Sequence, residues 1–182
     1  ATGNLGAVNA LNTKFVIENG AVLKTNAAVQ MGSPIKLETA EGGVINNSAD
    51  FIMNKAFYGT KLTKKGNGWL KLNTANSSLD TLVIDAGTVQ SVACNVPAKN
   101  VVFNSGELTE NTGTSYAIHV PAGKSGVWRT ASNATYNNAI KGEGTLTAYC
   151  NLQKGNGWYD YMLSVSFFFT NFATQFLLLK KL

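Results

Sequence analysis

A glycine followed two residues later by an apolar side chain recurs along this chain at a nearly constant interval. The pairs are Gly20/Val22, Gly43/Ile45, Gly68/Leu70, Gly87/Val89, Gly106/Leu108, Gly126/Trp128 and Gly144/Leu146. Successive glycines lie 23, 25, 19, 19, 20 and 18 residues apart. A period of about 20 residues is typical of a solenoid in which each unit stacks on the one before it. The repeat therefore predicts a stacked fold.

Short alternating strands surround these glycines. Leu82 and Ile84 precede Gly87 at the same offsets at which Val101 and Phe103 precede the next glycine, and alternation with period two is typical of half-buried strands. Glycine permits a tight corner that a Cβ would crowd, and the apolar residue two positions later is expected to return to the interior. With 18 glycines, three prolines and no long amphipathic helical stretch, the sequence predicts an all-β solenoid.

Departures from the period predict loops. The longest interval runs from Gly43 to Gly68, and it contains an aromatic-rich stretch at residues 51–58 that we interpret as an insertion. The segment 122–128 also carries extra residues. Loops on a solenoid are where binding surfaces are usually built, so both segments are candidate ligand-binding regions.

The composition divides the chain into a solenoid domain at residues 1–160 and a hydrophobic tail at 161–182. From Met162 onward there are five phenylalanines, no glycine and no acidic residue. Three interpretations of the tail stay open. It is a non-native chain end, a hydrophobic anchor of about 18 mostly apolar residues, or a cap on the open end of the solenoid. Membrane contact is expected only through residues 162–182.

The charge distribution argues against a nucleic-acid partner. The net charge of +5 comes mostly from scattered lysines, and the single arginine, Arg129, is expected to face water beside an inward Trp128. Nucleic-acid binders instead concentrate Lys and Arg in a stripe with interleaved aromatic residues. Cys94 and Cys150 fall in turns three apart, and three strand spacings of ~4.8 Å exceed the reach of a disulfide, so we expect both thiols to be reduced.

One segment resembles a known repeat. Residues 61–72 read Lys-Leu-Thr-Lys-Lys-Gly-Asn-Gly-Trp-Leu-Lys-Leu, residues 82–89 follow as Leu-Val-Ile-Asp-Ala-Gly-Thr-Val, and residues 140–147 look like a further copy. This pattern resembles the autotransporter-associated β-strand repeat, although Trp69 stands where that family usually has threonine. The resemblance implies a right-handed parallel β-helix in a large exported or surface-displayed protein of Gram-negative bacteria, often an adhesin. It identifies no catalytic residues.

We therefore predict a right-handed parallel β-helix of about seven turns. It is expected to form part of a longer protein that is extracellular or on the outer-membrane surface of a bacterium.

An enzyme on this scaffold would be a polysaccharide lyase or a glycoside hydrolase, which needs convergent carboxylates, a metal site or a base. Asp80 and Asp85 fall near one turn without partner acids in the adjacent turns. His119 lies between Ile118 and Val120, so alternation directs it to solvent, and the chain has no second histidine. The sequence therefore predicts no catalytic residues, no metal and no cofactor, with a polysaccharide-degrading enzyme as the alternative.

Aromatic and basic side chains near the best-matched repeat are the candidate ligand-binding residues. Trp69 precedes the inward Leu70 and should project outward, and Tyr58 lies where the repeat does not require burial. Exposed rings stack on sugar faces, and Lys64 and Lys65 complete the candidate set. We predict a non-catalytic structural or adhesive segment that contacts a polysaccharide or a cell-surface glycan. The alternative role for the rings is packing under loops or against a neighbouring domain.

Overall fold

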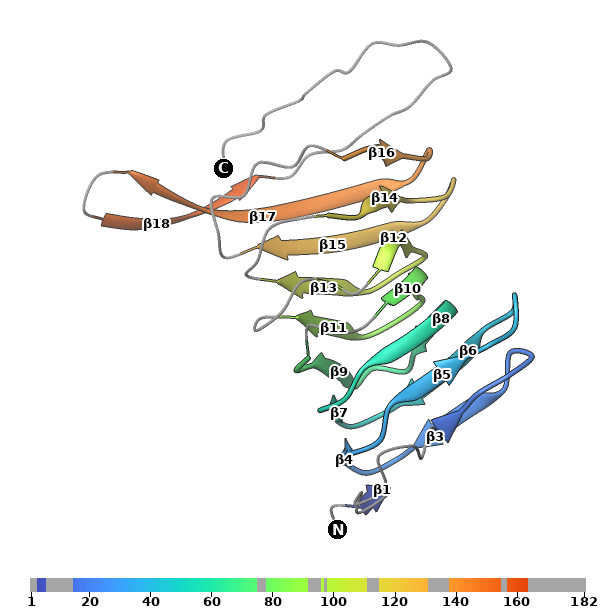
Figure 1. Cartoon of the computed structure of the whole chain (residues 1–182). Coiled ribbons are helices and arrows are strands. Elements are labelled where there is room, and N and C mark those ends of the chain that lie inside the picture. The colour runs from blue at the N-terminus through green and yellow to red at the C-terminus, as the bar shows by residue number, and fades with distance from the viewer. Residues whose placement is uncertain are drawn as a thin grey trace.

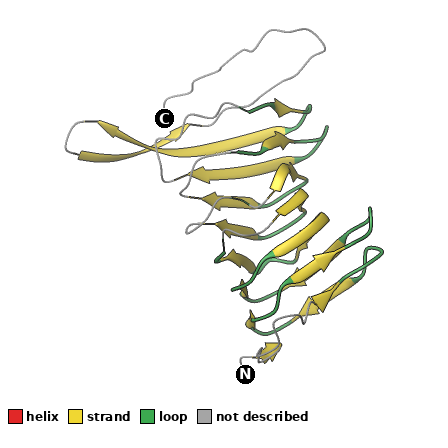
Figure 2. Ribbon diagram, viewed as in Figure 1, coloured by secondary structure: helices red, strands yellow, loops and turns green. Residues whose placement is uncertain are grey.

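Parallel strands stacked into two sheets, A and B, form the fold in the computed structural model of the chain (Figure 1). The structure describes residues 3–5, 15–74, 78–91, 96, 98–110, 115–130, 138–154 and 157–163, and it describes side chains within 15–149 of these ranges. Every element among these residues is a strand (Figure 2). The stack is a parallel β-helix of about six turns, which confirms the predicted fold class.

Sheet A contains nine strands. Its strands, in spatial order, are β1 (Gly3–Leu5), β4 (Val29–Met31), β7 (Phe51–Met53), β9 (Trp69–Leu72), β11 (Thr88–Ser91), β13 (Glu107–Glu110), β15 (Ser125–Thr130), β17 (Thr145–Lys154) and β18 (Gly157–Leu163). Neighbours pair in parallel up to β17, whereas β18 pairs antiparallel with β17. The β17–β18 hairpin extends sideways beyond the stack (Figure 1).

Sheet B forms the second side of the solenoid. Its strands are β2 (Phe15–Val16), β3 (Val22–Thr25), β5 (Ile35–Leu37), β6 (Gly43–Asn47), β8 (Phe57–Lys65), β10 (Ser78–Ile84), β12 (Ala98–Phe103), β14 (Ala117–His119) and β16 (Ile140–Lys141). Both β5 and β6 pair with the single long strand β8. The early turns therefore carry a bend in sheet B that the later turns lack.

The core consists of apolar columns that run along the stack. In sheet A, consecutive turns place Val29, Phe51, Leu70, Val89, Leu108 and Trp128 in register. In sheet B, Leu62, Leu82, Val101 and Ile118 are in register. All of these side chains are buried. Because each turn buries its apolar face only against its neighbours, these columns are the main source of stability in such a fold.

Five of the seven glycine pairs occupy equivalent places, and the first two do not. Gly68, Gly87, Gly106 and Gly144 each precede a strand of sheet A, Gly126 is the second residue of one, and the apolar residue two positions later is buried in every case. Gly20 and Gly43 instead precede or start strands of sheet B. Val22 is 57% exposed, and Leu23 pairs with Ile45 in its place. The prediction of an inward Val22 is wrong because the bend before β3 shifts the alternation by one residue.

The predicted insertion at residues 51–58 is also wrong. This stretch forms β7 and the start of β8, and the side chains of Phe51, Met53 and Phe57 are fully buried. The interval is long because its first glycine belongs to sheet B, so the count from Gly43 to the next glycine exceeds one turn. In the second predicted loop, only residues up to 124 lie outside a strand, since β15 starts at Ser125.

Several sequence predictions fall on the end of the chain. The predicted domain boundary between residues 160 and 161 lies inside β18, and residues 164–182 of the tail lie outside the described residues. Cys94 and the side chain of Cys150 lie outside them as well. Within the part that the structure describes, no helix is long and apolar enough to cross a membrane.

Candidate functional site

The four predicted ligand-binding residues lie at three different places. Trp69 projects from the outer face of sheet A and is 39% exposed, while Tyr58 projects from the outer face of sheet B and is 38% exposed. Lys65 is exposed at the corner where the chain leaves sheet B. Lys64 points inward and is 0% exposed. The outward direction of both rings agrees with the prediction, but the four residues do not form one site.

Lys64 stands in a column of apolar side chains in sheet B. It pairs with Ile45 of the turn before and with Ile84 of the turn after, and both of these are fully buried. This burial contradicts the prediction that Lys64 binds a surface ligand. The signal was present in the sequence, because alternation from the inward Leu62 places Lys64 on the same inner face. Burial also lowers the pKa of its ammonium group to about 8.

The buried ammonium is satisfied by backbone oxygens at two stacked corners. Lys64 Nζ donates hydrogen bonds to the carbonyl oxygens of Lys65 at 2.8 Å, Gly66 at 2.6 Å and Ala86 at 3.2 Å. A buried charge requires such partners, since an unpaired one would cost on the order of several kcal/mol. Lys64 therefore links the corner after β8 to the corner after β10.

The outer face of sheet A carries rings, charges and neutral polar groups. Its outward residues on adjacent strands include Trp69, Lys71, Thr88, Gln90, Glu107, Thr109, Val127, Arg129 and Tyr149. At one end, Lys71 Nζ lies 2.6 Å from Asp50 Oδ2 and 5.7 Å from the centroid of the Trp69 ring. These contacts restrict the indole to the face of the sheet while leaving part of the ring in solvent.

Arg129 organises the other end of this face. Its Nε donates a hydrogen bond to Glu107 Oε1 at 2.8 Å, and its guanidinium carbon lies 4.0 Å from the centroid of the Tyr149 ring. The neighbouring Trp128 points inward and is 7% exposed. The predicted directions of Arg129 and Trp128 are thus confirmed, whereas the ion pair with Glu107 was not foreseen because it joins residues of adjacent turns.

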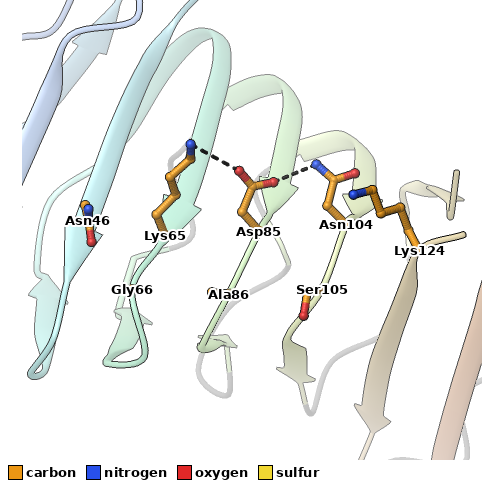
Figure 3. A pocket seen from close by; sticks show the side chains of 8 residues that line it. All are labelled: Asn46, Lys65, Gly66, Asp85, Ala86, Asn104, Ser105 and Lys124. Carbon is orange, nitrogen blue, oxygen red and sulfur yellow. Dashed lines mark hydrogen bonds and ion pairs between the residues drawn. The ribbon is translucent and has the colours of Figure 1, made fainter.

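A groove of about 520 Å³ runs along the corner where the chain passes from sheet B to sheet A; we call it the corner groove (Figure 3). It is lined by Asn46, Lys65, Gly66, Asp85, Ala86, Asn104, Ser105 and Lys124. Asp85 Oδ2 lies 3.5 Å from Lys65 Nζ, and Asp85 Oδ1 accepts a hydrogen bond from Asn104 Nδ2 at 2.6 Å. The stacked turns therefore place basic, acidic and amide side chains side by side.

A buried carboxyl group in sheet A was not predicted. Glu110 is 0% exposed, and its Oε1 accepts hydrogen bonds from Tyr116 Oη at 2.7 Å and Trp128 Nε1 at 2.9 Å. Its Oε2 has no hydrogen-bond partner among the residues that the structure describes. Burial raises the pKa of Glu110 above its ordinary value, an effect that the two donated hydrogen bonds oppose. Alternation from the inward Leu108 was the available signal.

The remaining titratable candidates are dispersed. His119 is exposed between the buried Ile118 and Val120, as predicted. Asp80 Oδ1 lies 2.6 Å from Lys99 Nζ on the outer side of sheet B, away from the corner groove that holds Asp85. Among the described residues, no group of three or more His, Cys, Asp or Glu side chains could hold a metal ion.

Comparisons of the chain with known protein families, with curated proteins and with solved structures found no match. The resemblance to the autotransporter-associated β-strand repeat therefore stays a prediction. So do the bacterial surface location and the adhesive role that this resemblance implies.

Proposed function

We propose that this chain is a non-catalytic structural and adhesive β-helix segment of a cell-surface or secreted bacterial protein. Its glycan contact is the outer face of sheet A. The observation that carries the proposal is the Trp69 ring, which is 39% exposed on the outer face of sheet A with Lys71 and Asp50 beside it. An aromatic face bordered by hydrogen-bonding groups suits a sugar ring, which has an apolar face and polar edges.

The stacked strands extend this face beyond one sugar. Thr88 and Gln90 of β11 follow Trp69 and Lys71 of β9 in register, and they supply neutral hydroxyl and amide groups. The Tyr149 ring lies four strands further along sheet A, at roughly four strand spacings of ~4.8 Å, or ~19 Å. An extended ligand is thus favoured over a compact one.

Several outer carboxylates are held by cations from neighbouring turns, which supports a structural role. Lys71 pairs with Asp50, Lys99 pairs with Asp80, and Arg129 pairs with Glu107. The two acids of sheet A and the acid of sheet B lie on different sides of the solenoid. Carboxylate catalysis instead needs two groups that converge on one bond.

The test combines binding and cleavage in one assay. The protein is incubated with a panel of neutral and acidic polysaccharides, and co-sedimentation and polymer length are followed together. We expect co-sedimentation with at least one polysaccharide and no shortening of the chains. Trp69→Ala should weaken this binding about tenfold, because the loss of one stacked ring costs roughly 1–1.5 kcal/mol.

Tyr58→Ala is the matched control, because its ring is equally exposed but lies on sheet B. We expect it to bind like the wild type. Shortened polysaccharide would overturn the non-catalytic role. Equal binding by Trp69→Ala and the wild type would overturn the choice of sheet A, and loss with Tyr58→Ala alone would move the contact to sheet B.

A further inference from the structure

The buried ammonium of Lys64 fixes the orientation of the peptide groups under the corner groove. The carbonyl oxygens that accept its hydrogen bonds belong to the peptides Lys65–Gly66, Gly66–Asn67 and Ala86–Gly87. Lys65 and Gly66 belong to the turn of Lys64, and Ala86 belongs to the turn after it, so the ammonium ties two consecutive turns together at this corner. Because Gly66 and Ala86 also line the groove, Lys64 holds the backbone beneath the groove in place.

Between the charged side chains, the floor of the groove is mostly backbone. Gly66 has a φ of 75° and carries no side chain, and Ala86 carries only a methyl group. Such positions allow a ligand to approach the main chain closely.

The three charged side chains that line the groove, Lys65, Asp85 and Lys124, give it a net charge of one positive unit. Asp85 is already held by Lys65 and Asn104. Lys124, at the far end of the groove, forms no ion pair with any described residue. Figure 3 shows these side chains along consecutive turns, with Lys65 and Lys124 on either side of Asp85 and Asn104. The groove thus combines a net positive charge with a backbone floor that Lys64 holds in place.

We propose that the corner groove binds the anionic group of an acidic glycan, a sugar carboxylate or sulfate. Two asparagine amides and the Ser105 hydroxyl also line the groove, and these neutral groups suit sugar hydroxyls better than a bare inorganic ion. A volume of about 520 Å³ lies within the range of small-ligand sites. This site is separate from the outer face of sheet A, and the inference does not depend on glycan binding there.

The experiment titrates the full chain with a hexasaccharide of uronic acid units and, in parallel, with its methyl ester and with inorganic sulfate. Affinity is measured by calorimetry, and the site is located by backbone amide NMR. We expect the uronate form to bind and to shift the amides of Gly66, Ala86 and Ser105, which line the groove. The methyl ester should bind at least tenfold more weakly, because it lacks the charge. Binding should also weaken with added salt.

Two lysine variants identify the site. Lys124→Gln removes the unpaired charge and should weaken uronate binding about tenfold, the effect of one charge-assisted contact of ~1.4 kcal/mol. Lys141→Gln is the matched control, since Lys141 is exposed and does not line the groove, and it should bind like the wild type. Trp69→Ala should retain uronate binding, which separates this site from the face of sheet A.

Three results would overturn the inference. The first is equal binding of the uronate and its methyl ester, and the second is wild-type affinity in Lys124→Gln. The third is sulfate binding as tight as that of the hexasaccharide, which would indicate an ion site without sugar recognition.

Discussion

Two buried ionisable residues show how individual side chains adapt to a solenoid interior. Lys64 and Glu110 both point inward. The neighbouring turns place isoleucines at the position of Lys64. At the position of Glu110 they place the hydroxyl residues Ser91 and Thr130. Lys64 is satisfied by three carbonyls. Glu110 is only partly satisfied, because Oε2 has no partner among the described residues. The carboxyl group is therefore the weaker point of the core.

The raised pKa of Glu110 predicts a pH dependence of stability. Because the pKa in the folded state lies above the ordinary value of 4.5, the protonated carboxyl contributes stability below about pH 4.5 that is lost as pH rises through the folded-state pKa. Glu110→Gln keeps the acceptor for Tyr116 and Trp128 and removes the titration. Relative to the wild type, this variant should therefore gain stability as the pH rises above 4.5.

Thermal unfolding followed by circular dichroism across this pH range measures the difference. Parallel pH profiles for Glu110→Gln and the wild type would contradict the assignment of a buried, titrating carboxyl.

At the scale of strands and corners, the sequence predicts the later turns better than the early ones. From Gly68 onward, each glycine pair marks a corner followed by a buried residue of sheet A. The first two pairs mislead because β2 and β3, like β5 and β6, split sheet B into two pieces. Each piece can start with a glycine, so the local pattern is the same in both sheets. Only the pairing of β5 and β6 with the same strand, β8, resolves the ambiguity.

The corners themselves yield a stability prediction. A Cβ on Gly87 would lie 2.4 Å from the carbonyl oxygen of Gly66 in the turn before, and Gly87 has φ of 70°. Gly87→Ala should therefore destabilise the fold by more than about 2 kcal/mol. Gly123→Ala is the control, because Gly123 has the same φ and nothing within 4 Å of its Cβ position. It should lose only about 1 kcal/mol, the cost of the backbone conformation.

Denaturant unfolding of both variants gives the two free energies of unfolding. Equal losses for Gly87→Ala and Gly123→Ala would show that stacked corners do not require glycine.

For the whole molecule, the fold class followed from periodicity, but the candidate site followed only in part. Alternation from Leu70 placed Trp69 outward correctly, because it depends on neighbours in the sequence. It could not show that Trp69 and Tyr58 lie on different sheets, since that depends on where each turn bends. Likewise, Lys65 and Asp85 are brought together by stacking of consecutive turns. Contacts between turns join residues about 20 apart, and no local pattern encodes them.

The central claim is that the outer face of sheet A acts as one extended glycan-binding surface. The most direct test measures affinity against oligosaccharides of increasing length, cut from a polysaccharide that co-sediments with the protein. Affinity should rise with length until the ligand spans the ~19 Å between Trp69 and Tyr149 and then level off. A disaccharide that binds as tightly as the longest oligosaccharide would contradict the claim.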